Sequence, residues 1–403
     1  MAVEPQVEPQ LDRTPIVVDD GGEVVDTVGT RRHGLPAATG RRVLGEVARP
    51  LGLFVASRLV TLSAIGIAVV VKGVVFSDVI HIWDGGWWIS TTMHGYPHAV
   101  PMIDGHAAQS TIAFFPMFPL LARGVMNVTG LPLLGSLLVV TTVFGGLTAV
   151  GLWYLTRRIL DADTADRTVA LFCFFPGSFI FSLVYAEPVM LALAVGCLLF
   201  LLQRRWLLAG VLAAMATASR PNAAVLIVCC AWEAGFAVMR RREWRALIAP
   251  ALAPVGIVSF FVFLRVRAGS LRAWFDVEKG GWGERIEPTA LWHYIQTFAR
   301  NGFAEWNIPV PLAGAVLILI GAVLLVRARV PPVLLVYTAG IVILTLSSKT
   351  LGARPRFILT AFPLFIGLAA HVRRLGFTVV VAVFAALLTL ITVLSTATLA
   401  LTP

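Results

Sequence analysis

The feature that most constrains this chain is a succession of long apolar runs separated by short clusters of arginine. A helix needs about 20 apolar residues to cross the hydrocarbon core of a bilayer. We expect about eleven such helices, at residues 51–72, 131–155, 168–186, 187–202, 206–220, 222–239, 246–266, 308–326, 331–347, 356–370 and 376–401. In lipid, only helices and closed barrels satisfy every backbone N–H and C=O. The sequence therefore predicts an all-α polytopic membrane protein that contacts membrane lipids.

The composition agrees with this class of protein. Charged residues make up only 13% of the 403 residues, against about 25% in a typical soluble protein. The net charge of +10 would indicate a nucleic-acid partner in a soluble protein, but here the basic residues lie between apolar runs. We therefore expect no nucleic-acid partner. All four cysteines lie inside apolar runs without a CxxC pair, which favours buried thiols over a disulfide or a metal site.

The arginine clusters predict the orientation of the chain. They precede the first span and then mark every second connection, at Arg41, Arg42, Arg49, Arg157, Arg158, Arg204, Arg205, Arg240, Arg241, Arg242, Arg245, Arg327, Arg329, Arg373 and Arg374. Cytoplasmic loops are enriched in arginine and lysine, so we expect a cytoplasmic N-terminus. Residues 1–48, rich in proline, glycine and acids, predict a disordered cytoplasmic tail before a membrane domain at 49–403.

The remaining connections then face the extracytoplasmic side. Three of them stand out, at residues 73–130, 267–307 and 347–356. The third is basic although it lies on the wrong side for the positive-inside bias, and an anionic ligand would explain this. Gly280-Gly281 in the second loop suits either a mobile loop or a plain solvated connection, while the proline-interrupted residues 111–126 favour a re-entrant or interfacial segment.

The first outer loop contains HIWDGGWWISTTMHGYP, in which Asp84 lies among three tryptophans. Burial near aromatic rings would raise the pKa of Asp84 and make it a better general base. The alternative is an ordinary interfacial belt formed by Trp83, Trp87 and Trp88. Histidines are frequent in this loop, but their spacing matches no tight ligand motif, so we expect no metal.

Three arginines on the outer side are candidates for binding an anion. Arg354 and Arg356, with Lys349 nearby, lie in the third outer loop, and Arg220 precedes a proline. Guanidinium groups match the geometry of phosphate, although Arg220 could also be a residue that snorkels from a helix end. Glu187 begins a span, where an acid is either functional or simply favoured by the helix N-terminus. We interpret Arg58 and Glu233, inside spans, as structural pairs or as residues that face a cavity.

Five motifs in order resemble the PIG-V type mannosyltransferases, which have the GT-C fold. They are WDGGWWISTTMHGYP, AFFPMFPLLAR, FFPGSFIFSLVYAEP, ATASRPNAAVL and ARPRFILTAFPLFIGLA, and the resemblance covers residues 50–375. With its composition, the chain looks like a bacterial, actinobacterial-like member. The departures from the family pattern are Ala186, Pro221, Ala223 and Gln109, which put the acceptor in doubt more than the chemistry.

The resemblance implies transfer of mannose from polyprenyl-phosphate-mannose to a lipid or glycolipid acceptor on the extracytoplasmic face, with inversion. Asp84 would be the general base, and Arg354, Arg356, Lys349 and Arg220 would bind the donor phosphate. The residues expected to contact substrate are Trp83, Trp87, Trp88, His94, Tyr96, Tyr185, Glu187 and Asn222. No nucleotide or other soluble cofactor is expected, and the chemistry does not demand a metal.

Three alternatives to this reading stay open. The sugar could be arabinose or glucose instead of mannose. The chain could be a transporter or flippase of lipid-linked sugars, although it shows no internal repeat of the kind that such proteins usually have. It could also be a scaffold in which Asp84 and the outer arginines are replaceable.

Overall fold

The computed structural model describes residues 17–18, 24–25, 40–303, 308–349 and 354–398. The chain divides into two units, Met1–Glu46 and Val47–Pro403. In the first unit, β1 (Val17–Val18) pairs antiparallel with β2 (Val24–Val25). Most of the predicted disordered tail lies outside the described residues, as do residues 350–353 of the third outer loop, and the tail remains a prediction.

The second unit is almost entirely helical. Its long helices are α1 (Gly40–Lys72), which begins in the first unit, α5 (Leu133–Ile159), α6 (Ala162–Phe174), α7 (Glu187–Leu202), α8 (Trp206–Thr217), α9 (Val225–Arg241), α11 (Val255–Ala268), α14 (Pro309–Arg327), α15 (Pro332–Leu346) and α18 (Arg374–Val393). Shorter elements between them are α2 (Phe76–Ile80), α3 (Asp84–His94), η1 (Thr111–Ala113), α4 (Met117–Thr129), η2 (Pro176–Ser182), η3 (Pro221–Ala224), η4 (Trp244–Leu247), α10 (Ile248–Leu252), α12 (Ala273–Gly281), α13 (Ala290–Asn301), α16 (Pro355–Thr360), α17 (Pro363–His371) and η5 (Leu394–Thr398). The strands are β3 (Met102–Ile103) and β4 (His106–Ala107).

Six helical stretches of the described chain are long and apolar enough to cross a membrane. They are Gly45–Lys72, Leu133–Ile159, Pro221–Arg241, Trp244–Ala268, Pro309–Arg327 and Arg374–Ala397. A seventh would be the pair η2 and α7, which is bent by 108°, and α8 and α15 are shorter apolar helices. The protein is thus a multi-pass membrane protein, but the expected count of about eleven spans is not confirmed.

Proline explains why some expected spans are broken. The run 168–186 divides into α6 and η2 at Pro176, and the run 356–370 divides into α16 and α17 at Pro363. Proline has no N–H to donate and clashes with the preceding turn, so a regular helix cannot continue through it. Apolar content alone does not reveal these breaks.

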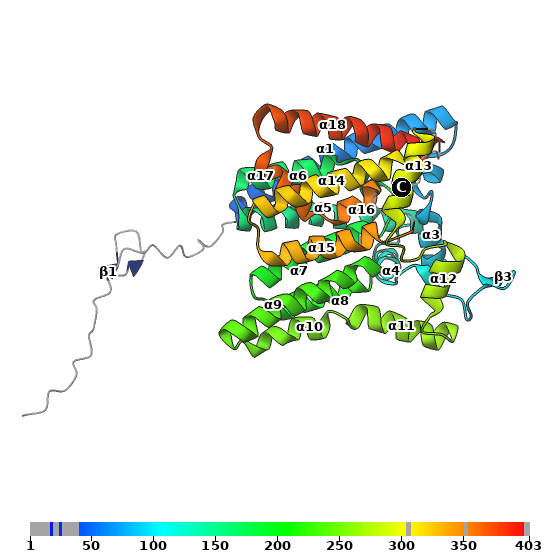
Figure 1. Ribbon diagram of the computed structural model, residues 1–403, viewed down its shortest axis with the longest axis horizontal. Coiled ribbons are helices and arrows are strands. Elements are labelled where there is room, and N and C mark those ends of the chain that lie inside the picture. The colour runs from blue at the N-terminus through cyan, green and yellow to red at the C-terminus, as the bar shows by residue number, and fades with distance from the viewer. Residues whose placement is uncertain (1–16, 19–23, 26–39, 304–307, 350–353, 399–403) are drawn as a thin grey trace, which may run out of the picture. The chain divides into compact units, whose positions relative to one another are not determined.

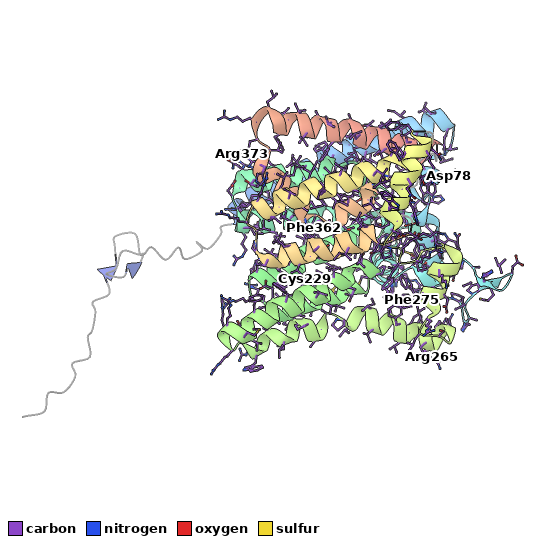
Figure 2. All side chains as sticks on the ribbon, in the orientation of Figure 1. Asp78, Cys229, Arg265, Phe275, Phe362 and Arg373 are labelled. Atoms are coloured by element: carbon purple, nitrogen blue, oxygen red, sulfur yellow. The ribbon has the colours of Figure 1, made fainter. Side chains whose placement is uncertain are left out.

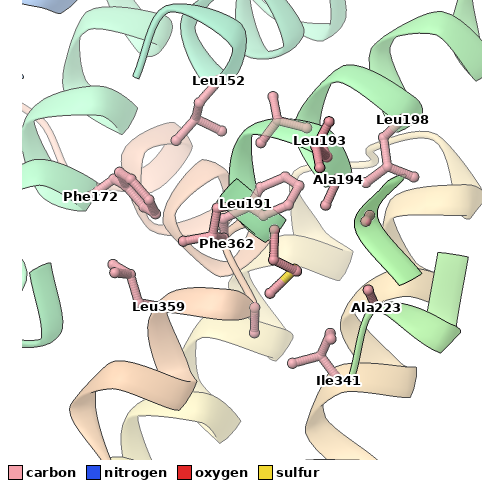
Figure 3. Packing of buried hydrophobic residues seen from close by; sticks show 14 of the residues in the cluster. Leu152, Phe172, Leu191, Leu193, Ala194, Leu198, Ala223, Ile341, Leu359 and Phe362 are labelled. Carbon is pink, nitrogen blue, oxygen red and sulfur yellow. The ribbon is translucent and has the colours of Figure 1, made fainter. Parts of the chain in front are cut away.

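Helix α7 lies in the middle of the core. It packs against α5 and α8, and most of its side chains are buried. Figure 3 shows Leu191, Leu193 and Leu198 of α7 among Leu152 of α5 and Phe172 of α6. Because α7 is surrounded on all sides, a polar residue at its end is held by a rigid frame.

The outer-loop elements gather at one end of the helices. Helices α3, α12 and α13 and the strand β3 lie together on the right of Figure 1. In Figure 2, Asp78 and Phe275 lie at this end, whereas Arg373 of one basic cluster lies at the other end. The orientation of these two ends across the membrane stays a prediction. The segment 111–126 forms η1 and the first turns of α4, which packs on α3 and α5.

The second outer loop is docked tightly on the first. A Cβ on Gly280 would lie 2.5 Å from the carbonyl oxygen of Ala107, and one on Gly281 would lie 2.7 Å from the backbone nitrogen of Gln109. Contacts this short leave room only for glycine. An isolated β-bridge, Ile286 to Ser348, joins the second loop to the third. The two glycines therefore allow the second loop to pack closely on the first.

Candidate active site

Asp84 occupies the first turn of α3, directly after a residue with an unusual backbone. Trp83, the N-cap, has φ 58° and ψ −120°, a backbone conformation that residues other than glycine rarely adopt. Its indole Nε1 donates a hydrogen bond to the carbonyl oxygen of Ser395, 3.2 Å away. Strain of this kind is commonly found at functional sites. The free N–H groups at the start of α3 favour a negatively charged carboxylate at Asp84.

Arg356 holds the Asp84 carboxylate. Its Nη1 donates a hydrogen bond to Asp84 Oδ2 over 2.6 Å, although 272 residues separate the two in the chain. The side chains are 11% and 23% exposed, so Asp84 is the more accessible partner. The guanidinium carbon lies 5.5 Å from the centre of the Tyr185 ring, a cation–π distance, and Tyr185 itself is fully buried.

Glu187 joins this pair to a second arginine. Its Oε1 accepts a hydrogen bond from Arg220 Nη2 at 2.7 Å and lies 3.9 Å from Arg356 Nη1. The Glu187 side chain is only 1% exposed, at the bend where η2 ends and α7 begins. Asp84, Arg356, Glu187 and Arg220 therefore form an alternating chain of charges, which we call the carboxylate–arginine cluster.

The arginines decide the charge of Asp84. Burial by itself would raise the pKa of this carboxyl, but Arg356, Arg220 and Arg354 outweigh it and hold the pKa below its ordinary value. Burial likewise acts to lower the pKa of Arg356, and the neighbouring Asp84 reverses this and raises it. The expectation that the pKa of Asp84 is raised is wrong, because the effect of nearby cations on this carboxyl is larger than the effect of aromatic burial.

A further acid from the second outer loop lies near the cluster. Burial, the neighbouring Glu284 and the charge of Asp84 raise the pKa of Glu278 to about 7, against an opposing effect of Arg220. Glu284 accepts a hydrogen bond from Ser348 Oγ at 2.7 Å. No role could be predicted for Glu278 from the sequence, because no motif marks this residue and its position depends on the docking of α12.

Two residues of the scaffold fix the backbone at Arg356. Arg58 of α1 donates hydrogen bonds to the Ser178 carbonyl oxygen at 2.6 Å and to Ser182 Oγ at 3.1 Å, which clamps η2. A Cβ on Gly177 in η2 would lie 2.1 Å from the carbonyl oxygen of Pro355. The glycine thus lets the chain just before Arg356 rest directly on η2. Arg58 is structural, as expected.

The three tryptophans have different environments. Trp88 is fully buried, edge-on to Phe114 and Phe118 with ring centres 4.8 Å and 5.3 Å away. Trp88 is therefore a packing residue in this structure, and we leave it out of the substrate contacts expected from sequence. Trp87 stacks on Phe114 and is only half buried, and Trp83 is half buried beside Asp84. These two tryptophans keep surface that a ligand can contact.

Several other expected site residues lie away from the cluster or play another part. His94 is exposed at the far end of α3, about 15 Å along the helix axis from Asp84. Tyr96 donates its hydroxyl to the carbonyl oxygen of Phe114 at 2.7 Å, a structural contact. Lys349 is exposed, and its Nζ lies 3.8 Å from the place that a Cβ on Gly283 would occupy.

Arg354 and Asn222 each lie two residues from an arginine of the cluster in the sequence. Arg354 is half buried and acts on the charge of Asp84. Asn222 follows Arg220 in η3, and its Oδ1 is buried without a hydrogen-bond partner in the described part of the chain. No group of three or more His, Cys, Asp or Glu residues is arranged to hold a metal ion among the residues that the structure describes.

No protein-family model matches the chain, and the comparison with curated proteins gave no match. Two of the solved structures that match this chain are the following. The crystal structure of ArnT from Cupriavidus metallidurans bound to undecaprenyl phosphate matches 79% of this chain and 60% of its own, with 14% identity and a TM-score of 0.48. The apo oligosaccharyltransferase of Archaeoglobus fulgidus matches 84% of this chain and 55% of its own, with 13% identity and a TM-score of 0.43. Scores below 0.5 do not establish a shared fold or activity, and this chain spans less than two thirds of either.

Proposed function

We propose that this multi-pass membrane protein is an inverting GT-C type glycosyltransferase, which moves mannose from polyprenyl-phosphate-mannose to a lipid or glycolipid acceptor on the extracytoplasmic face. The observation that carries the proposal is the hydrogen bond of 2.6 Å between Asp84 and Arg356, with Glu187 and Arg220 beside it, at the end of the helices that the outer loops cover. The choice of mannose rests on the resemblance of the five sequence motifs.

The arginines would hold the phosphate of the donor. Burial and the neighbouring Arg356 both act to lower the pKa of Arg354, against opposing effects of Tyr294 and Glu284, so the two cations lie close enough to repel each other. A phosphate between them relieves this repulsion and accepts hydrogen bonds from both forks. It would also be stabilised as it leaves the sugar carbon, where charge develops on its oxygen.

Asp84 would take the proton from the acceptor hydroxyl as that hydroxyl attacks the sugar carbon. A phosphate that is already ionised leaves readily, so the reaction needs a base more than an acid. A positioned base typically contributes 10²–10⁴-fold to the rate. The proposal includes no nucleotide and no metal, and Trp83 and Trp87 would contact the sugar or the first part of the prenyl chain.

The test is transfer of labelled mannose from polyprenyl-phosphate-mannose to lipids, in membranes that contain wild-type or Asp84→Asn protein in equal amounts. We expect a lipid product from the wild type and at least a ~100-fold loss in the variant. Asp78→Asn is the matched control, because it removes an exposed carboxylate from the same loop, and it should retain activity. Equal product from both variants would contradict the role of Asp84. Transfer of another sugar but not of mannose would contradict the proposed donor sugar and would leave the proposed type of reaction standing.

A further inference from the structure

Arg356 lies beside two carboxylates that are held in different ways, Asp84 with an N–O distance of 2.6 Å and Glu187 with one of 3.9 Å. Glu187 belongs to the first turn of α7, is 1% exposed and also bonds Arg220 at 2.7 Å. Asp84 belongs to the outer layer and is 23% exposed. Among the ion pairs of the described residues, its one partner is Arg356. One carboxylate is therefore part of the core and the other is partly accessible to solvent.

Glu187 cannot leave Arg356 without a large penalty. Its Oε2 is buried with no hydrogen-bond partner in the described residues, and its side chain is only 1% exposed. Removing one member of a buried ion pair leaves an uncompensated charge, which is strongly unfavourable. Glu187 is for this reason suited to hold Arg220 and Arg356 at a fixed separation.

Asp84 can leave Arg356 at a smaller penalty, because water already reaches its side chain. A phosphate that arrives from the outer side meets an arginine whose Nη1 already donates to a carboxylate over 2.6 Å. The Nε of the same guanidinium is buried and lacks a partner in the described chain. The phosphate must therefore either share Arg356 with Asp84 or replace it, and three anionic groups around one guanidinium repel one another.

We propose that Glu187 is the fixed partner of Arg356 and Asp84 its exchangeable partner, so that the donor phosphate replaces the Asp84 carboxylate and frees it to act as the base. This inference rests on the proposed function. It makes Glu187 a positioning residue, not a substrate contact as the sequence led us to expect. Donor binding then comes first, and the acceptor hydroxyl meets a free carboxylate only when the donor is in place.

The exchange gives opposite predictions for the two carboxylates in one binding measurement. Binding of polyprenyl monophosphate, which carries no sugar, is measured for the purified full chain in lipid nanodiscs. Asp84→Asn removes the competitor, so the affinity should rise about 3- to 10-fold, equivalent to about 0.7–1.4 kcal/mol. Glu187→Gln removes the charge that holds the two arginines at a fixed distance from each other, so the affinity should fall about 10-fold or more.

Kinetics separate positioning from a general structural effect. Glu187→Gln should raise KM for the donor much more than it lowers kcat, whereas Asp84→Asn should lower kcat without raising KM. Glu187→Asp keeps the charge but shortens the reach to Arg220, and it should restore part of the affinity that Glu187→Gln loses. This variant also keeps the test valid if Glu187→Gln does not fold.

An unchanged or lower affinity in Asp84→Asn would overturn the exchange. An unchanged affinity in both Glu187 variants would overturn the positioning role. Because polyprenyl monophosphate carries no sugar, affinity changes of the predicted sign without any sugar transfer would contradict the proposed function but not the exchange.

Discussion

The two ends of the carboxylate–arginine cluster are built from different regions of the molecule. Glu187 and Arg220 belong to the tightly packed region around α7, where the Glu187 side chain is 1% exposed and the Arg220 side chain is 14% exposed. Asp84 and Arg356 lie under the outer loops, where the backbone at Trp83 is strained and the second loop closes over the first. The region around α7 thus holds Glu187 with Arg220, the outer layer holds Asp84, and Arg356 lies between the two carboxylates.

The largest effect should come from removing the cation that both regions share. Arg356→Ala leaves Asp84 and the buried Glu187 without a common partner, and it removes a phosphate ligand. We expect activity to fall ~10²–10³-fold, the loss typical of an electrostatic stabiliser. Arg356→Lys keeps the charge but not the fork and should fall between this variant and wild type. Mannose transfer at equal protein level measures both, and a fully active Arg356→Ala protein would contradict the account.

A smaller effect should follow from disturbing the contact between the regions. Gly177→Ala places a Cβ 2.1 Å from the carbonyl oxygen of Pro355, so the segment that carries Arg356 must shift. Overpacking typically destabilises by about 1–3 kcal/mol. We expect a lower Tm and a several-fold weaker donor affinity. Gly235→Ala, on α9 where a Cβ meets nothing within 4 Å, is the control and should change neither.

The pH dependence should distinguish the acids of the outer layer. Glu278 has a pKa raised to about 7 from 4.5 by burial, Glu284 and Asp84. The folded state then holds more protons than the unfolded state between pH 4.5 and 7, so stability falls as the pH rises through this window, by at most about 3 kcal/mol. The lowered pKa of Asp84 has the opposite effect on stability. Stability falls there as the pH drops below the ordinary pKa of an aspartate.

Glu278→Gln should remove the fall in stability between pH 4.5 and 7, as measured by thermal unfolding across that range. Arg220 and Asp84 act on Glu278, so Asp84→Asn should also reduce the fall, although less. Asp276→Asn, an exposed change on the same helix, should leave the pH dependence as it is. A fall that persists in Glu278→Gln would show that another group titrates there.

The smallest effect should come from Lys349. Its side chain is exposed beside Gly283 in the second loop. Exposed charges contribute about 0–1 kcal/mol, so we expect Lys349→Ala to raise KM for the donor less than ~5-fold. A loss of activity in Lys349→Ala as large as that in Arg356→Ala would mean that the third loop binds the phosphate through its lysine, and would contradict the role given to the arginines.

The sequence predicted the core better than it predicted the outer layer. Apolar runs separated by arginine clusters indicate a multi-pass helical protein, because each helix that crosses the lipid requires an apolar run and the charged residues lie in the connections. The number of spans could not be predicted, since Pro176 and Pro363 break runs whose hydrophobicity is continuous. The site motifs brought Asp84, Arg356, Glu187 and Arg220 to attention separately. Their contacts join distant parts of the chain, which local patterns do not report.

Side-chain environments in the outer layer were harder still. Trp87 and Trp88 are neighbours with the same chemistry, yet α3 turns one toward the core and leaves the other half exposed. The direction of the pKa of Asp84 depends on arginines from other elements. The role of Glu278 depends on a helix docked through Gly280 and Gly281. Each of these follows from tertiary packing and not from spacing along the chain.

The central claim is that the accessible carboxylate of the cluster is the base. The most direct measurement is the rate of mannose transfer by Asp84→Asn and Glu187→Asp at saturating polyprenyl-phosphate-mannose. The account predicts that kcat falls at least ~100-fold in Asp84→Asn even with the donor bound, and that it stays within ~10-fold of wild type in Glu187→Asp. A near-normal kcat in Asp84→Asn, with the large loss in Glu187→Asp instead, would contradict it.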